Sequence, residues 1–298
     1  MSNDLKATPI GPFAAPGNWY RGALHVHTSN SDGADAPAVV LERYRALGYD
    51  FVAITDHQKV TRAPAPEGML VLPGVEQHLS DDVSGKQWHF VGIGFEDEPR
   101  TSWTSPDEIV RFLRPRAAYL VAAHPYWSGL SGEDLHKFTQ CDAVEVFNTL
   151  CAVEIARGSS EPIWDHLLSY KARLNCVAVD DTHQRRHRVD IGKAWVMVKA
   201  KELSEDSILN ALKQGHYYSS TGPEILDFNH LLGTYSVKSL PCRSVAFMCN
   251  TWYGRRFEAP VGGTLTEADY TLQGREVYLR AQVTDHLGRR AWTNPVYF

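Results

Sequence analysis

The chain has 298 residues, of which 43% are hydrophobic and 22% charged, enough to bury the core of one large α/β domain or of a domain with a smaller companion. The formal net charge is −5 and the pI is near 6.2, so the composition argues against a general nucleic-acid or membrane-surface binder, which would carry a basic face. A small anionic substrate held by a few local charges is compatible with this balance.

The cysteines and the N-terminal residues predict a cytoplasmic protein. The cysteines are odd in number, irregularly spaced and without a CxxC pair, which predicts free thiols in a reducing compartment. Residues 1–20 lack the apolar segment of a signal peptide, and no run of about 18 apolar residues occurs. The cysteines are Cys141, Cys151, Cys176, Cys242 and Cys249.

In chain order, apolar strands alternate with helices as far as residue 215. The pattern predicts strands over 22–28, 49–57, 68–78, 87–95, 118–125, 141–148, 174–183 and 192–200. It predicts helices over 36–48, 105–116, 161–173 and 204–215, with Ser105 and Ser204 as N-caps and Gly48 and Gly215 at helix ends. Such alternation is typical of parallel strands buried on both faces, and it predicts an α/β barrel with its chemistry at the carboxyl ends of the strands.

The sequence changes character after residue 222. From Ile225 onward helix signals are absent, and β-forming segments are separated by Gly and Asn turns. We therefore expect two parts, a barrel over 1–222 and a small all-β, sandwich-like element over 223–298.

Histidines and carboxylates follow the predicted strands of the barrel. Residues i and i+2 of a strand point to the same face, so His25 and His27 form a chelating pair, and Asp181 and His183 share a face in the same way. Imidazole with carboxylate suits Zn, Mn or Fe, and the absence of thiolate argues against a structural zinc site. The polar residues at the strand ends are His25, His27, Asp32, Asp56, His57, Glu76, His78, His89, His124, Glu145, Asn148, Asp180, Asp181 and His183.

These residues exceed what one ion needs. An ion takes about four to six ligands, so the set suffices for two or three ions, with a carboxylate such as Glu76 free to bridge. So many buried polar groups would be costly without cations. Asp56 and Asp180 each precede a stronger candidate by one residue and so point away, which favours a supporting role. His78 shares the face of Glu76, but nothing else recommends it, and we interpret it as structural.

Six motifs together carry a resemblance. "LHVHTSNSDG", "FVAITDH", "GVEQH", "HFVGIGF", "VAAHP" and "VDDTH" occur in an order that resembles the PHP (polymerase and histidinol phosphatase) superfamily, over about residues 20–222. The resemblance implies a distorted (β/α)7 TIM-like barrel, a trinuclear metal site at the carboxyl ends of the strands, and phosphoester hydrolysis. The later segments "ILNALKQGHYYSSTGPEI" and "VTDHLGRRAWTNPVYF" resemble the CehA/McbA branch, named after a carbaryl hydrolase.

Matched motif by motif, the resemblance also implies the metal ligands. Two to three divalent ions, Mn²⁺, Fe²⁺ or Zn²⁺, are the expected cofactors. All the implied positions hold the residue type that the family uses, which favours an active member. The first set is His25, His27, Glu76 and Asp181; the second shares Glu76 and adds His89 and His124; the third is Asp32, His57 and His183.

Cationic side chains after the strand ends are the predicted substrate contacts. Arg157 follows "EVFN", and Arg185, Arg186 and His187 follow "DDTH" directly. Because arginine suits bidentate phosphate contacts, the three arginines are predicted to hold the substrate, with Arg157 and Arg186 also assisting catalysis. His187 is predicted to protonate the leaving oxygen. The further substrate contacts predicted are Asn148, which could instead orient a ligand, and Tyr126.

The sequence therefore predicts a metal-dependent hydrolase that cleaves a small phosphomonoester, or a linear or cyclic phosphodiester, by attack of a metal-bridging hydroxide. Its expected partner is a small phosphate-containing anion, with neither a nucleic-acid polymer nor a membrane, and the oligomeric state is left open. Two alternatives stay open: a carboxyl or carbamate ester hydrolase that uses the same metals, and a metal-binding module without catalysis.

Overall fold

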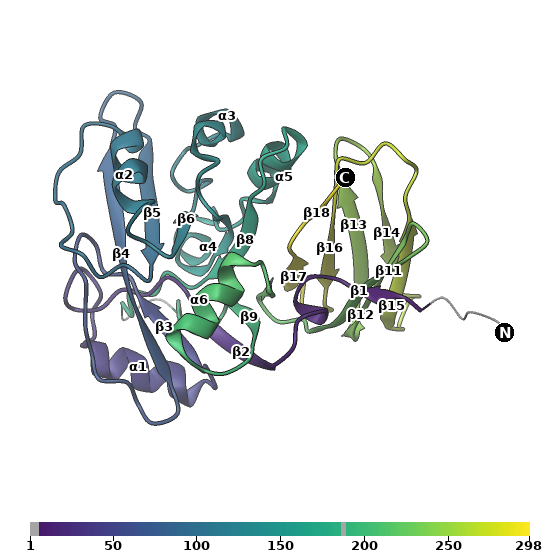
Figure 1. The fold of residues 1–298 in the computed structure, drawn as a ribbon, viewed down its shortest axis with the longest axis horizontal. Coiled ribbons are helices and arrows are strands. Elements are labelled where there is room, and N and C mark those ends of the chain that lie inside the picture. Colours follow the sequence, from purple (N-terminus) through teal and green to yellow (C-terminus); the bar gives the residue numbers. More distant parts are fainter. Residues whose placement is uncertain (1–5, 186–188) are drawn as a thin grey trace.

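The computed structural model describes residues 6–185 and 189–298, drawn as a ribbon in Figure 1. The helices are α1 (Pro37–Ala46), α2 (Pro106–Leu113), α3 (Gly132–Leu135), α4 (Thr149–Ile155), α5 (Glu161–Ser169) and α6 (Glu205–Lys213), with 3-10 turns η1 (Gly11–Phe13) and η2 (His136–Phe138). The earlier strands are β1 (Thr8–Pro9), β2 (Asn18–Ala23), β3 (Phe51–Ile54), β4 (Leu70–Ser80), β5 (Gln87–Ile93), β6 (Tyr119–Ala122), β7 (Ala143–Asn148), β8 (Asn175–Val179), β9 (Trp195–Ala200) and β10 (Tyr217–Ser220). The later strands are β11 (Ile225–Leu231), β12 (Thr234–Cys242), β13 (Ser244–Cys249), β14 (Gly254–Glu258), β15 (Leu265–Thr271), β16 (Tyr278–Thr284), β17 (Arg290–Thr293) and β18 (Val296–Tyr297).

The helix ends follow the local sequence signals. The side chains of Ser105 and Ser204 accept hydrogen bonds from the backbone N–H groups of Glu108 and Ser207, so both predicted N-caps are confirmed. Gly48 and Gly215 adopt φ angles of +78° and +69° just beyond α1 and α6, the left-handed conformation that ends a helix. Among the helices described, α3 and α4 were not predicted, because their four and seven residues give too little periodicity to detect.

One large mixed sheet organises the fold. Its 14 described strands include the run β9-β2-β3-β4-β5-β6-β7-β8 in spatial order. The pairs β2–β3, β3–β4, β6–β7 and β7–β8 are parallel, but β5 is antiparallel to both of its neighbours. The expectation of parallel strands throughout is therefore wrong. The turn over 81–86 returns the chain directly beside β4, which allows only antiparallel pairing.

A single bridge joins the segments that follow β2 and β8. Val26 and Thr182 form an isolated parallel bridge. Beside it, the N–H of His27 donates to the carbonyl of Thr182 at 3.1 Å, and the N–H of Asp181 donates to the carbonyl of His25 at 3.0 Å. This contact sets the histidine pair against the carboxylate that ends β8. The structure thus shows a mixed α/β fold, and the (β/α)7 barrel stays a prediction.

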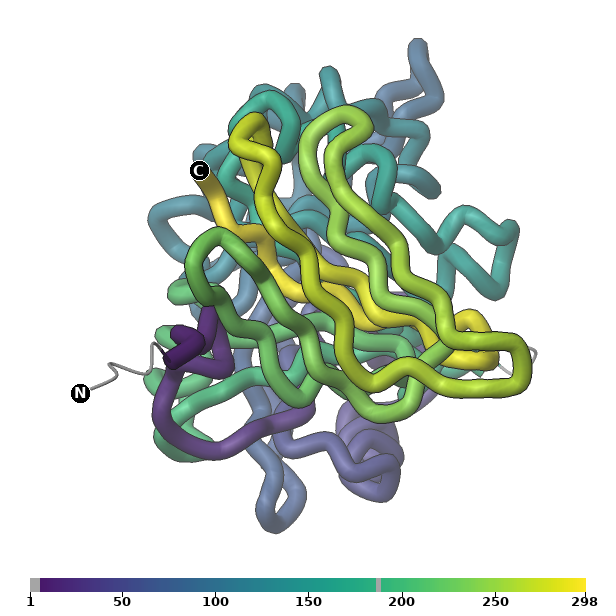
Figure 2. Tube along the Cα trace, turned by 90° about the vertical axis from the view of Figure 1, so that its right-hand side faces the viewer, coloured from purple at the N-terminus to yellow at the C-terminus, as the bar shows by residue number. Residues whose placement is uncertain are grey.

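The described part beyond Ile225 contains strands and no helix. A second sheet has four described strands in the order β1-β11-β12-β15, and it packs against β13 and β16 of the large sheet. A buried apolar cluster that includes Val237, Val245 and Phe247 fills the space between the two sheets. Figure 2 looks onto these strands, which lie across the face of the molecule. The large sheet continues into this region because β17 pairs antiparallel with β10.

The helices α2 and α5 cover the large sheet near β5 and β7. Their buried residues, such as Val110 and Trp164, belong to the same apolar cluster as Phe90 and Val144 of the strands. All five cysteines are buried and free, as the sequence predicted. In the described residues, no helix is long and apolar enough to cross a membrane.

Candidate metal centre

The nine predicted ligands meet at one end of the run β2 to β8. Most lie just past a strand, but Glu76 lies within β4 and His89 is the third residue of β5. The expectation that every such group follows the carboxyl end of its strand is wrong for His89. Because β5 runs antiparallel to β4, the beginning of β5 lies beside the end of β4, and His89 pairs in register with His78.

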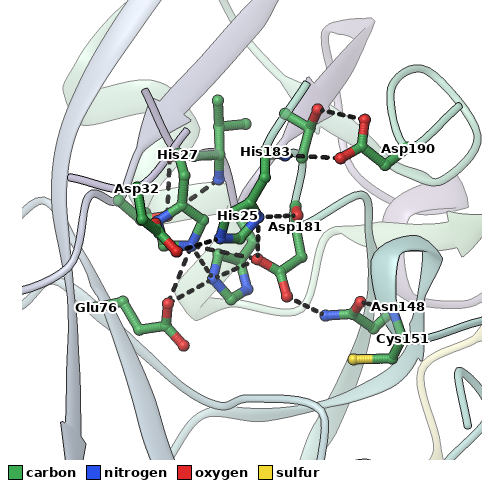
Figure 3. Close-up of polar contacts among 12 residues, drawn as sticks. His25, His27, Asp32, Glu76, Asn148, Cys151, Asp181, His183 and Asp190 are labelled. Carbon is green, nitrogen blue, oxygen red and sulfur yellow. Dashed lines mark hydrogen bonds and ion pairs between the residues drawn. The ribbon is translucent and has the colours of Figure 1, made fainter. Parts of the chain in front are cut away.

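The first set forms a tight, buried group (Figure 3). His25 Nε2 and His27 Nε2 each lie 3.0 Å from Glu76 Oε2. Oδ1 of Asp181 lies 3.3 Å from His25 Nε2 and 3.2 Å from His27 Nε2. One ligand atom from each residue lies within 4.8 Å of the others, which is a spacing that a single ion can bridge.

Two further groups share residues with the first. His57, Glu76 and His89 offer ligand atoms within 4.8 Å of one another, with His89 Nδ1 at 2.7 Å from Glu76 Oε1. His124 Nε2 lies 3.4 Å from the same oxygen, so the predicted second set comes together with His57 added.

The predicted third set also gains a histidine. His27, Asp32, His57 and His183 form a group with the same 4.8 Å spacing, and His183 Nε2 lies 3.1 Å from Asp32 Oδ2. His27, His57 and Glu76 thus each belong to two groups, as expected of a centre that can hold several ions.

Glu145 and Asn148 support this cluster by hydrogen bonds. Glu145 Oε1 lies 2.6 Å from His25 Nδ1, and its Oε2 accepts from the backbone N–H of His124 at 2.8 Å. The Asn148 amide donates to Glu145 Oε2 at 2.9 Å and to Asp181 Oδ2 at 3.0 Å. Glu145 was noted at the end of its strand without a role. Such hydrogen bonds fix the orientation of a ligand and raise its basicity.

Asp190 is a supporting residue that the sequence analysis missed. Its carboxylate accepts from the backbone N–H of His183 at 2.7 Å and from the Thr182 hydroxyl at 3.1 Å. It therefore fixes the segment that carries His183. Asp190 lies in an irregular segment beyond "QRRHR" with no periodic pattern, so nothing in the sequence distinguished it from a surface carboxylate.

Asp56 and Asp180 point away from the cluster, in agreement with the supporting role expected. Asp56 accepts from the backbone N–H of Thr28 at 2.7 Å, and Asp180 accepts from those of Gly192 at 2.6 Å and Lys193 at 2.9 Å. Burial raises the pKa of Asp180 to about 6 in spite of these hydrogen bonds. Both carboxylates hold loops around the site.

Two of the predicted ligands have a strained backbone. Asp181 has a φ of +54° and His124 a φ of +27°, in the region that residues other than glycine rarely adopt. Neighbouring contacts keep both in place, since the N–H of Asp181 bonds to His25 and that of His124 to Glu145. Strain of this kind concentrates at functional sites.

The electrostatics of the cluster favour cations. Burial lowers the pKa of His27, but the Asp181 and Glu76 carboxylates beside its ring outweigh burial and raise the pKa to about 9. Burial opposes ionisation of Asp181, yet His25 and His27 hold its pKa well below the usual range. For His57, burial outweighs the attraction of Glu76 and lowers the pKa to about 3. The cluster therefore combines ionised carboxylates with at least one neutral imidazole.

The surroundings of Asp181 Oδ1 indicate whether this donor set fits a metal. The oxygen is buried and has no hydrogen-bond partner among the described residues, although two imidazole nitrogens face it. An ionised oxygen in this position is costly unless a cation completes its surroundings. Imidazole and carboxylate ligands of this kind suit divalent transition metals, so the residues present fit the group that the motifs imply.

A cavity of about 200 Å³ opens onto the cluster. Arg185 lines it, and its Nη2 lies 3.4 Å from Asp32 Oδ2. Arg157 is exposed, with its guanidinium 5.6 Å from the ring centre of Tyr126, and the described lining includes neither residue nor Asn148. The predicted Arg186 and His187 lie outside the described residues. The described lining is Asp32, His57, Glu76, His89, His124, Trp127, Leu150, Cys151, Glu154, Asp181, His183 and Arg185.

Comparisons with known proteins agree with the fold. No family model matches the chain. An uncharacterised protein of Methanocaldococcus jannaschii is 26% identical over 137 residues, which are 42% of this chain and 80% of that protein. A phosphoribosyl 1,2-cyclic phosphate 1,2-diphosphodiesterase of Eggerthella lenta is 32% identical over 80 residues, which are 25% of this chain and 30% of that protein. The chain thus matches less than a third of the length of the second relative.

One solved structure matches nearly the whole chain. It is a two-domain protein of Bacteroides vulgatus, described as containing a predicted PHP-like metal-dependent phosphoesterase. The TM-score is 0.54 at 16% identity, and the match covers 96% of this chain and 95% of that one. At this identity the likeness shows a shared fold. The coarse expectation, a mixed α/β fold like that of PHP-like proteins, is therefore confirmed.

Proposed function

We propose that this chain is a metal-dependent phosphoesterase. The observation that carries the proposal is the convergence of nine histidines and carboxylates, among them Asp181, whose Oδ1 is buried without a hydrogen-bond partner among the described residues. The shared fold with a PHP-like protein and the short similarity to a cyclic phosphodiesterase support it. The active part is the PHP barrel proposed for residues 1–222, with the region 223–298 as an appended β element of the CehA/McbA type.

Each of the three ligand sets would hold one divalent ion, Mn²⁺, Fe²⁺ or Zn²⁺. When bound, such ions activate a water molecule at neutral pH and neutralise charge on a phosphoryl oxygen. Glu76 is suited to bridge two ions because its two oxygens face different histidines: Oε2 faces His25 and His27, and Oε1 faces His89.

The remaining roles belong to the residues around the cavity. Arg185 lines the cavity and can bind an anionic oxygen there by its guanidinium. Arg157 and Tyr126 lie outside this lining and would contact only a part of the substrate that extends beyond it. Asn148 acts through Asp181, which its amide holds. Arg186 and His187 stay predicted, as a phosphate contact and a general acid.

The cavity favours a phosphate over an aryl carbamate. Most side chains in its described lining are ionisable. The large apolar side chains in that lining are Trp127 and Leu150. An aryl carbamate would need a deeper apolar slot. The volume of about 200 Å³ suits a small substrate, either a monoester or a cyclic diester.

The proposal is tested with the purified chain, stripped of metal and reloaded in turn with Mn²⁺, Fe²⁺ and Zn²⁺. Turnover of p-nitrophenyl phosphate, bis-p-nitrophenyl phosphate and a naphthyl ester is compared. Metal-dependent turnover of either phosphate is the expected result. Turnover of the naphthyl ester alone would favour the carboxyl ester alternative, and metal binding without turnover of any substrate would favour the non-catalytic module.

A further inference from the structure

His78 is a titratable residue in contact with the cluster that belongs to no ligand set and, unlike Glu145, has no supporting role described above. It lies on β4 two residues after Glu76 and is partly buried. Its Nδ1 lies 3.1 Å from His57 Nδ1, and its ring stacks on that of His89 with 5.3 Å between ring centres and 27° between planes. The sequence offered no reason to separate it from a structural histidine.

Backbone pairing fixes His78 in this position. His57 forms a parallel bridge with Glu76, and His78 pairs in register with His89 across β4 and β5. The side chains of Glu76 and His78 leave the same face of β4 because they are two residues apart. His78 therefore stands beside the group of His57, Glu76 and His89, which at the 4.8 Å spacing does not include it. Its nitrogen contact with the group is through His57, whose Nδ1 lies 3.3 Å from Glu76 Oε2.

The distance between the two imidazole nitrogens suits two arrangements. Two nitrogens bound to one ion at about 2.1 Å each lie roughly 3.0–3.4 Å apart, depending on the coordination geometry. The observed 3.1 Å falls in this interval and also suits an N–H···N hydrogen bond. The usual hydrogen-bond partner of a ligating histidine, however, is a carboxylate, a backbone carbonyl or water rather than another imidazole.

We propose that His78 is an additional metal ligand, which joins His57, Glu76, His89 and His124 in a site with four imidazoles and one carboxylate. The inference rests on the proposed function, since it assumes that the cluster binds metal. A set so rich in nitrogen binds Zn²⁺ more tightly than Mn²⁺, in line with the general order of affinity. This site would therefore be the most zinc-selective of the three.

The test measures metal binding, with or without activity. Metal-free wild type, His78→Ala and His78→Asn are titrated with Zn²⁺ against a competing chelator, and bound ions are counted by elemental analysis. Asparagine keeps a hydrogen-bonding group near the position of Nδ1 and the size of the side chain, but it is a poor zinc ligand. The matched control is His286→Ala, since His286 is exposed in the loop between β16 and β17.

We expect both His78 variants to bind one Zn²⁺ at least about 100-fold more weakly, beyond the roughly 10–100-fold that loss of an outer hydrogen bond costs. The visible spectrum of the Co²⁺-loaded protein should change in both variants and not in His286→Ala. Wild-type affinity in His78→Ala, or its restoration in His78→Asn, would overturn the assignment as a ligand. If the wild type itself binds no divalent ion, the proposed function fails instead.

Discussion

The molecule buries two clusters of charged groups, one at the ends of β2 to β8 and one where the C-terminal part meets α5, and the charge is balanced differently in each. In the C-terminal part, Arg280 of β16 is fully buried, and its guanidinium donates to both oxygens of Asp165 on α5 at 2.7 and 2.6 Å. Its Nη1 has no hydrogen-bond partner in the described chain, but the guanidinium lies over the ring of Trp164. Both oxygens of Asp165 are paired with Arg280 within the protein, so the role of this ion pair is structural.

The cluster at the ends of β2 to β8 is not complete in this sense. The neighbouring imidazoles of His25 and His27 keep the Asp181 carboxylate ionised, and both face the same oxygen, Oδ1. This oxygen has no hydrogen-bond partner in the described chain. The contrast distinguishes a buried ion pair that ties two parts of a fold together from a buried cluster whose donor set fits external cations. Mutations in the two clusters should therefore affect different properties.

The largest expected effect is on activity, from a change in the cluster at the strand ends. Asp181→Asn removes a charge that two of the imidazoles face and weakens the hold on metal. Metal ions contribute several kcal/mol to transition-state stabilisation, so kcat/KM for whichever assay phosphate the wild type hydrolyses should fall at least about 1000-fold. Steady-state kinetics and metal content check this. The control Asp82→Asn, at an exposed turn, should change neither, and an active Asp181→Asn would contradict the metal centre.

The next effect is on stability, from a change in the C-terminal cluster. Arg280→Met leaves Asp165 and Glu161 without their buried partner, and breaking such a pair costs about 3 kcal/mol of unfolding free energy. Urea denaturation measures it, with and without added metal. The loss should be the same in both states. Arg243→Met, at an exposed arginine, should cost less than about 0.5 kcal/mol. A loss that appears only with metal present would show that the two clusters are coupled.

The same contrast explains what the sequence could predict. Several proposed ligands in the cluster at the strand ends lie in short motifs with i and i+2 spacing. His25, His27, Asp181 and His183 could therefore be predicted as ligands from the chain alone. Glu76 and His89 could be named as well, but the direction of β5 could not, because periodicity does not determine whether neighbouring strands are parallel. The helices α2 and α6 were predicted from their caps, whereas the short α4 was not.

Long-range partners were beyond reach for a different reason. Arg280 and Asp165 are 115 residues apart, and neither carries a local pattern that marks it as buried. The supporting contacts of Asp190 and Glu145 likewise depend on how loops pack, and the role of His78 depends on its register with β5. Sequence patterns identify the groups that do chemistry, while the residues that position them are defined by tertiary structure.

A third prediction concerns pH and distinguishes the clusters by proton release. The pKa of His27 is raised to about 9, so this histidine is protonated at pH 7 in the metal-free protein, and a metal must displace the proton. Metal affinity should therefore rise about tenfold per pH unit for this proton between about pH 6.5 and 9. The contribution of His27 to stability in the metal-free protein is fully present below the ordinary pKa of 6.5 and is lost as the pH rises through 9.

Calorimetric titration in buffers of different ionisation enthalpy, at pH 6.5, 7.5 and 8.5, measures this proton release. Arg280→Met should show the same slope of affinity against pH as the wild type. Burial opposes the charge of Arg280, but the carboxylates of α5 outweigh it and raise the pKa, so this arginine stays charged throughout the interval and releases no proton. An affinity that does not change with pH would mean that His27 is already neutral in the metal-free protein.

The smallest expected effects come from one arginine near each cluster. Arg185 lines the cavity beside Asp32 and is partly exposed, so Arg185→Ala should raise KM for the phosphate substrate about tenfold, with a change in unfolding free energy below about 0.5 kcal/mol. Arg290 pairs with Glu161 on α5 and is also partly exposed, so Arg290→Ala should lower the unfolding free energy by about 1 kcal/mol and leave KM unchanged. Kinetics and urea denaturation on both variants measure the two quantities side by side. A rise in KM for Arg290→Ala would mean that the cluster around Arg280 influences the substrate cavity through α5. It would contradict the expectation that the two clusters control different properties.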